Sequence, residues 1–99
     1  MSMPTVRVVA RLIAFPDKVD DLKALLLKVV ESTRTETGCI RYELLQNQAD
    51  PTDFTFVEEW GSDEALNTHL GSEHVGAALA RAPELLVEGP DIRRYSLLI

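Results

Sequence analysis

Residues 54–74 read FTFVEEWGSDEALNTHLGSEH, and the rest of the chain is organised around this stretch. Its first seven residues alternate and are rich in aromatic and β-branched side chains, which predicts a strand over residues 54–60. The alternation places four side chains on one face of that strand: Phe54, Phe56, Glu58 and Trp60. One face of the strand therefore carries a carboxylate together with the only tryptophan of the sequence.

A helix is predicted directly after this strand, over residues 63–70. Ser62 is a favourable N-cap, and the two acidic residues after it place negative charge in the first helical turn. Three residues form the apolar stripe of this helix: Ala65, Leu66 and Leu70. His69 lies within that stripe. We therefore expect His69 to point toward the sheet, on the side that carries Trp60.

Alternation of apolar and polar residues predicts three further strands: residues 6–13, 39–46 and 91–99. A polar turn at residues 48–53 joins two of the strands, so residues 39–60 are expected to form an antiparallel hairpin. Gly89–Pro90 is interpreted as a turn before the last strand. That strand stays apolar to Ile99, and we expect its end to be packed.

Two more helices are predicted from helical spacing and from capping residues. An amphipathic helix begins at Pro16–Asp17, and Gly38 is placed to end it as a left-handed cap. Ser72 can cap a second short helix that runs to about Ala82, and Pro83 marks the break after it. Both helices are expected to cover one face of the sheet.

The order strand, helix, strand, strand, broken helix, strand predicts one α+β domain over residues 1–99. This is a ferredoxin-like split βαβ sandwich, with a four-stranded antiparallel sheet and helices on one face. The other face carries apolar residues mixed with charged ones, which predicts a homodimer; the alternative is the mixed face of a monomer. Its apolar members are Val9, Ile13, Leu45, Val57, Leu97 and Ile99.

Composition excludes several classes of partner. The net charge is −6 and the pI is about 4.8, so no basic surface is available for nucleic acid or for an anionic membrane. The sequence carries one cysteine, Cys39, which suits a reducing cytoplasm and is expected to pack as a small apolar residue. No signal peptide or spanning segment is expected, and the predicted location is cytoplasmic.

Three residues are the candidates for chemistry. His69 is a candidate general base because its ordinary pKa lies near neutral pH, and the alternative is a structurally satisfied histidine. Trp60 offers a flat wall and an N–H donor to an aromatic ligand, or it is simply core. Glu58 could orient His69, or it could form an ion pair with an arginine, for which the sequence offers three: Arg7, Arg11 and Arg94.

Five more residues are expected to line a substrate pocket: Tyr42, Phe54, Phe56, Leu66 and His74. Each has a simpler alternative, as a core residue or, for His74, as an exposed side chain. His69 and His74 alone are a weak signal for a metal, because two histidines without a third ligand seldom hold zinc. We therefore predict no metal site.

Three segments resemble the antibiotic biosynthesis monooxygenase family: residues 36–42 (ETGCIRY), 58–62 (EEWGS) and 69–74 (HLGSEH). The resemblance implies a dimeric α+β barrel, in which two ferredoxin-like units pair sheet to sheet. It is greatest for small members that oxidise hydroquinones without metal or flavin. The haem-degrading branch is a poor match, because its functional positions fall at Ala10, His69 and Leu79, and Leu79 cannot ligate iron.

The resemblance thus implies a cofactor-independent monooxygenase whose partners are a small electron-rich aromatic substrate, a hydroquinone or phenol, and dioxygen. One alternative is an isomerase of a small carbonyl or sugar-like signal compound, in which the same histidine shuttles protons. Another is a non-catalytic dimer that binds a small ligand, because a fold alone does not determine function.

Overall fold

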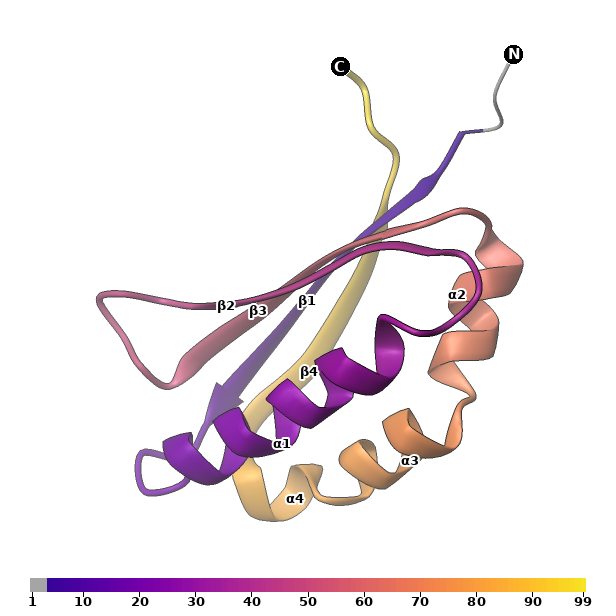
Figure 1. The fold of residues 1–99 in the computed structure, drawn as a ribbon. Helices are drawn as coiled ribbons and strands as arrows, with labels where there is room; N and C mark the ends of the chain where they lie inside the picture. The colour runs from indigo at the N-terminus through magenta and orange to yellow at the C-terminus, as the bar shows by residue number, and fades with distance from the viewer. Residues whose placement is uncertain (1–3) are drawn as a thin grey trace.

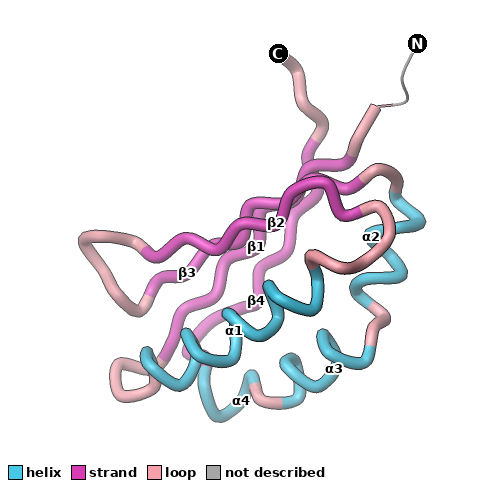
Figure 2. Tube along the Cα trace, viewed as in Figure 1, coloured by secondary structure: helices cyan, strands magenta, loops and turns pink. Residues whose placement is uncertain are grey.

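The predicted strands and helices form one layer of each kind in the computed structural model, which describes residues 4–99. The elements are β1 (Val6–Ala14), α1 (Val19–Thr33), β2 (Cys39–Gln46), β3 (Asp53–Trp60), α2 (Asp63–Leu70), α3 (Glu73–Ala80), α4 (Ala82–Leu85) and β4 (Leu86–Tyr95). The strands pair antiparallel in the order β2-β3-β1-β4. All the labelled helices cover one face of this sheet (Figures 1 and 2). The predicted α+β, ferredoxin-like arrangement is confirmed.

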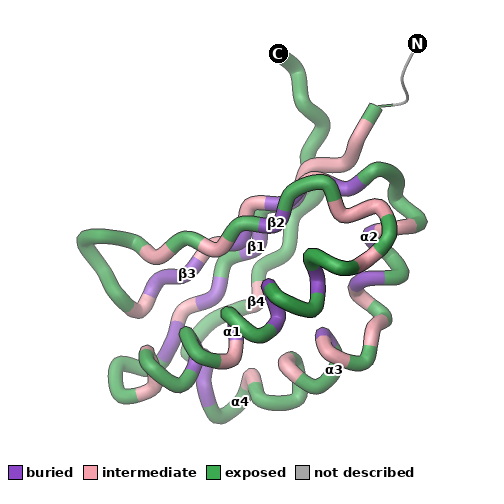
Figure 3. Tube along the Cα trace, in the orientation of Figure 1, coloured by how far each residue is buried: buried purple, intermediate pink, exposed green. Residues whose placement is uncertain are grey.

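The core lies between the sheet and the helices, as the alternation in the strands requires. Every second residue of β1 from Val8 to Ala14 is buried. The helix α1 meets this face with residues at helical spacing: Leu22, Leu26, Val29, Val30 and Thr33. Buried residues recur along α1 and along the central strands in Figure 3, whereas the segment after β4 is exposed. No helix among residues 4–99 is long and apolar enough to cross a membrane.

The ends of α1 differ from the sequence prediction. The helix begins at Val19 rather than at Pro16–Asp17, and Lys18 at its N-cap makes no side-chain hydrogen bond. It ends at Thr33, so Gly38 does not cap it. Gly38 instead turns the chain into β2 with a φ of +86°, a left-handed conformation that glycine adopts without strain. The positive φ was predicted correctly, and its role as a helix cap was wrong.

Gly38→Ala is expected to destabilise the fold by about 1–3 kcal/mol, because a side chain is strained at this φ. The new Cβ would also lie 2.6 Å from the Cβ of Ala65, which belongs to α2. Gly76→Ala is the matched control, since nothing lies within 4 Å of its added Cβ and alanine favours a helix. Urea unfolding should show opposite changes for the two variants. Equal stability of Gly38→Ala and the parent would contradict this account.

The last strand also differs from the prediction. It runs from Leu86 to Tyr95 and includes Gly89–Pro90, where its register with β1 is irregular. Proline is tolerated there because β4 is an edge strand. The pairing with β1 ends at Arg7–Tyr95, so the following residues have no strand beside them. Leu98 and Ile99 are fully exposed, and the predicted packed C-terminus is wrong for the single chain.

The helix that Ser72 caps ends at Ala80, close to the predicted end at about Ala82. Pro83, predicted to mark the break after it, lies in the first turn of the next helix, α4, where no N–H is needed. On the uncovered face, Val9 is 37% exposed and Leu45 is 49% exposed. Two ion pairs cross this face: Arg7–Glu59 and Arg11–Asp53. Leu97 and Ile99, which were predicted to share the face, lie beyond the end of β4.

Candidate functional site

A cavity of about 70 Å³ lies between the sheet and the helices. Its lining is almost entirely aliphatic and comes from β1, α1, α3, α4 and β4, with Leu22, Leu26, Val75, Leu79 and Leu86 among the contributors. Two ionisable side chains of the described chain reach it, Glu58 from β3 and His69 from α2. The cavity is therefore an apolar space with one carboxyl group and one imidazole on its wall.

His69 is held by capping contacts at both ends of α2. The Ser62 hydroxyl accepts a hydrogen bond from the Ala65 N–H at the start, and the Ser72 hydroxyl donates to the His69 carbonyl at the end. The ring Nδ1 lies 2.7 Å from Glu36 Oε2. An ionised carboxylate only accepts, so Nδ1 carries the proton and Nε2 keeps its lone pair. This arrangement leaves Nε2 as the basic atom of the ring.

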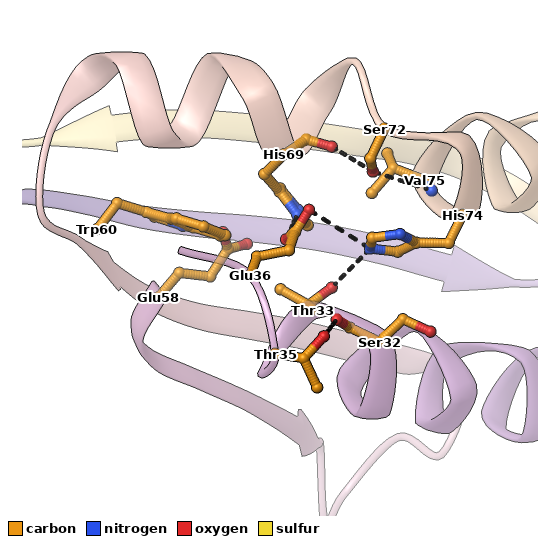
Figure 4. A network of polar contacts seen from close by, with 10 residues as sticks. All are labelled: Ser32, Thr33, Thr35, Glu36, Glu58, Trp60, His69, Ser72, His74 and Val75. Carbon is orange, nitrogen blue, oxygen red and sulfur yellow. Dashed lines mark hydrogen bonds and ion pairs between the residues drawn. The ribbon is translucent and has the colours of Figure 1, made fainter. Parts of the chain in front are cut away.

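Aromatic rings surround His69 within the core. The ring of Trp60 lies against it, with centroids 4.6 Å apart and planes inclined by 35°. The ring of Tyr42 meets it edge-on at 5.4 Å. These two ring contacts restrict the orientation of the imidazole. Figure 4 shows Trp60, His69 and Glu36. His69 does lie on the sheet side of its helix beside Trp60, as its place in the apolar stripe predicts.

Glu58 has a different partner from the ones that the sequence suggested. Its Oε1 accepts a hydrogen bond of 2.8 Å from Trp60 Nε1, within the same strand. The predicted contact with His69 is absent from the described hydrogen bonds, because Glu36 occupies that position. The three candidate arginines pair elsewhere, with Glu59, Asp53 and Asp63. Neither alternative for Glu58, orienting His69 or pairing with an arginine, is therefore found among the described residues.

Burial sets the protonation of these groups. It lowers the pKa of His69 below its ordinary value, although the hydrogen bond to Glu36 acts in the opposite direction. It raises the pKa of Glu58, against the effect of the Trp60 hydrogen bond. It also raises the pKa of the Tyr42 hydroxyl, so this phenol is neutral. At neutral pH the site therefore presents an uncharged imidazole that is able to accept a proton.

The structure separates the predicted pocket residues into two groups. Phe56 lines the cavity together with Glu58 and His69. The others lie outside the cavity lining: Trp60, Tyr42, Phe54, Leu66 and His74. The first four of these are buried in the core, where Tyr42 packs on Phe56 with ring centroids 4.8 Å apart. They form the support behind the cavity wall rather than its surface.

Glu36 is a site residue that the helical and strand patterns of the sequence did not indicate. It lies in the loop between α1 and β2, where neither helical nor strand spacing assigns a side chain to a face. Its contact with His69 joins residues 33 positions apart, which only the tertiary fold brings together. The one available signal was its place in the ETGCIRY segment that carries the family resemblance.

His74 approaches the same carboxylate from the start of α3. Its Nε2 lies 3.8 Å from Glu36 Oε1 and 3.2 Å from the Thr33 hydroxyl (Figure 4). Glu36, His69 and His74 thus offer one donor atom each, all within 4.8 Å of one another. The sequence prediction of no metal rested on a missing third ligand, and the fold supplies a candidate for it.

The family description "antibiotic biosynthesis monooxygenase" matches residues 5–81 of this chain. The chain belongs to this family. The match includes Glu36, His69 and His74, and the family identified from the sequence resemblance is confirmed. It does not assign a substrate.

Of two similar proteins, one carries a monooxygenase name and the other is uncharacterised. A protein of Mycobacterium tuberculosis, Rv0793, provisionally named a monooxygenase, is 38% identical over 82% of this chain and 79% of its own length. An uncharacterised protein of Synechocystis, sll1783, is 29% identical over 83% of this chain, and the match spans 56% of that longer protein. Monooxygenase activity is thus indicated by the name of the family and of one relative.

Solved structures agree with the fold. The structure of Rv0793 superposes with a TM-score of 0.89, at 32% identity over 96% of both chains. A crystal structure described as an antibiotic biosynthesis monooxygenase gives a TM-score of 0.89 at 28% identity, covering 95% of this chain and 99% of the other. A conserved protein of Methanosarcina mazei gives 0.87 at 32% identity, covering 94% and 92%.

Proposed function

We propose that this protein is a cofactor-independent monooxygenase that oxidises a small electron-rich aromatic compound, a hydroquinone or phenol, with dioxygen. The observation that supports this proposal is His69, which lines an aliphatic cavity and whose Nδ1 lies 2.7 Å from the Glu36 carboxylate. A carboxylate that holds Nδ1–H leaves Nε2 as a base, and an apolar cavity suits both an aromatic ring and dioxygen. The family names point in the same direction.

The proposed reaction begins with proton transfer from the substrate hydroxyl to His69 Nε2. The phenolate passes one electron to dioxygen, which gives a phenoxyl radical and superoxide. These join at a ring carbon that bears hydrogen, and the resulting peroxide takes the proton back from His69 to give a hydroperoxide. Loss of that carbon's proton breaks the O–O bond and releases water. One atom of dioxygen thus enters the quinone product, and the other leaves in water.

The side chains have separate tasks in this proposal. Glu36 keeps the proton on Nδ1 and stabilises the imidazolium that forms at His69. Glu58, whose pKa burial raises, holds the Trp60 N–H and faces the cavity. The aliphatic wall keeps water from the radical pair, which limits leakage of superoxide. The protein supplies the base and the dry space, and the substrate supplies the electrons.

Oxygen uptake with a panel of hydroquinones tests the proposal. We expect turnover by the purified chain alone, not lost on treatment with chelator and unchanged by added flavin, with one quinone formed for each dioxygen consumed. Labelled dioxygen should place one oxygen atom in the product. A requirement for added flavin or metal would contradict the cofactor-independent mechanism.

A homodimer is expected in solution, with the sheets facing each other. The uncovered face exposes Val9 and Leu45, and the segment after β4 exposes Leu97, Leu98 and Ile99. Apolar surface of this extent is costly in water and is removed by association. Light scattering at micromolar concentration should give twice the 11.0 kDa mass of the chain. A monomer at that concentration would rule out the dimeric barrel.

A further inference from the structure

Three potential ligand atoms meet beside the cavity, each from a different segment of the chain. They are Oε of Glu36 in the α1–β2 loop, Nδ1 of His69 in α2 and Nε2 of His74 in α3. His69 Nδ1 and His74 Nε2 lie 2.7 and 3.8 Å from the two carboxylate oxygens, and all the ligand atoms lie within 4.8 Å of one another. Figure 4 shows both imidazoles directed at the one carboxylate.

We propose that Glu36, His69 and His74 form a binding site for one divalent transition-metal ion of the zinc class. Two imidazoles and one carboxylate are a donor set that zinc accepts, with a fourth position left open. Bonds of about 2.0–2.1 Å at tetrahedral angles separate the ligand atoms by about 3.3 Å. The observed separations fall on both sides of this value. Side-chain rotations that move the ligand atoms by about an ångström therefore complete the site.

The surroundings give an ion access to the ligand atoms. The Thr33 hydroxyl, itself fully buried, forms a hydrogen bond of 3.2 Å with His74 Nε2, and an ion bound at that nitrogen replaces this hydrogen bond. The Glu36 and His74 side chains are 18% and 27% exposed, so an ion reaches them from solvent, while that of His69 is 4% exposed. The chain carries a net charge of −6, which raises the local concentration of cations.

Metal binding has a consequence that rests on the proposed function. The ion and the Nδ1 proton compete for the same nitrogen, because both occupy the position between His69 and Glu36. A neutral imidazole that binds metal through Nδ1 carries its proton on Nε2. That atom then has no lone pair for the substrate proton. The metal-bound protein is therefore the inactive form, and the metal-free protein is the active one.

The test uses the full chain, freed of metal with chelator and then dialysed. Zinc titration by calorimetry should give one ion per chain. Cobalt(II) should give the strong visible absorption of a four- or five-coordinate ion. His74→Ala and Glu36→Gln should each weaken binding about tenfold or more. Glu73→Gln is the matched control, because it removes an exposed carboxylate next to His74 and should bind like the parent. Circular dichroism confirms that each variant is folded.

Three outcomes would overturn the metal site: no saturable binding, equal binding by the parent and both ligand variants, or loss of binding in Glu73→Gln. Zinc should also stop oxygen uptake by the parent, and His74→Ala should need about tenfold more zinc for the same inhibition. The two proposals fail separately. Stoichiometric metal binding without oxygen uptake would leave the site and remove the oxygenase, whereas oxygen uptake without metal binding would do the reverse.

Discussion

His69→Ala is expected to lower the proposed hydroquinone oxidation by about 10²–10⁴-fold, the usual contribution of a general base. The physical reason is that His69 lines the cavity and that Glu36 holds the proton on Nδ1, which leaves Nε2 as the basic atom of the ring. The loss should appear in kcat, because the imidazole acts on the substrate proton and contributes little to binding. Oxygen-electrode rates and quinone absorbance at saturating substrate measure it.

His69→Asn separates chemistry from packing. An asparagine amide can still donate to Glu36, but it cannot accept a proton at neutral pH. We expect this variant to lose as much activity as the alanine variant while keeping more of the parent's stability. His69→Ala should cost roughly 1–2 kcal/mol of folding free energy, within the common range for one substitution. An active, folded His69→Asn protein would show that the substrate ionises without this base.

Much of the fold follows from two periodicities of the sequence, the alternation of residues in strands and the helical spacing of apolar residues. The alternation in β3 placed Phe54, Phe56, Glu58 and Trp60 on one face, and all four are buried. This strand is central in the sheet, so one face is packed along its whole length and the pattern is clean. The edge strand β4 lacks this constraint, and its bounds were predicted poorly. The Gly89–Pro90 pair looks like a turn in the sequence, but in the structure it lies inside β4, where the register with β1 is irregular.

The site residues could be predicted only where they lie on one helix or on a strand and the helix that directly follows it. His69 was found because it interrupts the apolar stripe of α2, and Trp60 was placed beside it because strand and helix are consecutive. Glu36 and the approach of His74 depend on how α1, α2 and α3 pack, which no local pattern encodes. Glu58 was placed on the correct face, but its partner was not, since Trp60 lies within reach two residues along the same strand.

Trp60→Ala is expected to remove about 3–5 kcal/mol of folding free energy, the usual cost of deleting a buried tryptophan. Its side chain is fully buried, so the deletion leaves a cavity beside His69. The same change leaves the buried Glu58 carboxyl without its Trp60 donor. For a small domain with a total stability of about 5–15 kcal/mol, this is a large fraction. Urea unfolding monitored by circular dichroism measures the loss.

Trp60→Phe isolates the hydrogen bond, because it keeps an aromatic ring and removes only the N–H donor. We expect a loss of about 1–3 kcal/mol that depends on pH. The Trp60 hydrogen bond opposes the effect of burial on the pKa of Glu58, so removing the donor raises that pKa further. A raised carboxyl pKa means that the folded state binds the proton more tightly, and stability falls as pH rises from the ordinary value of 4.5 through the folded-state pKa. The variant should therefore be closest to the parent near pH 4.5 and furthest from it at neutral pH. A pH-independent difference would show that Glu58 finds another donor when the indole N–H is lost.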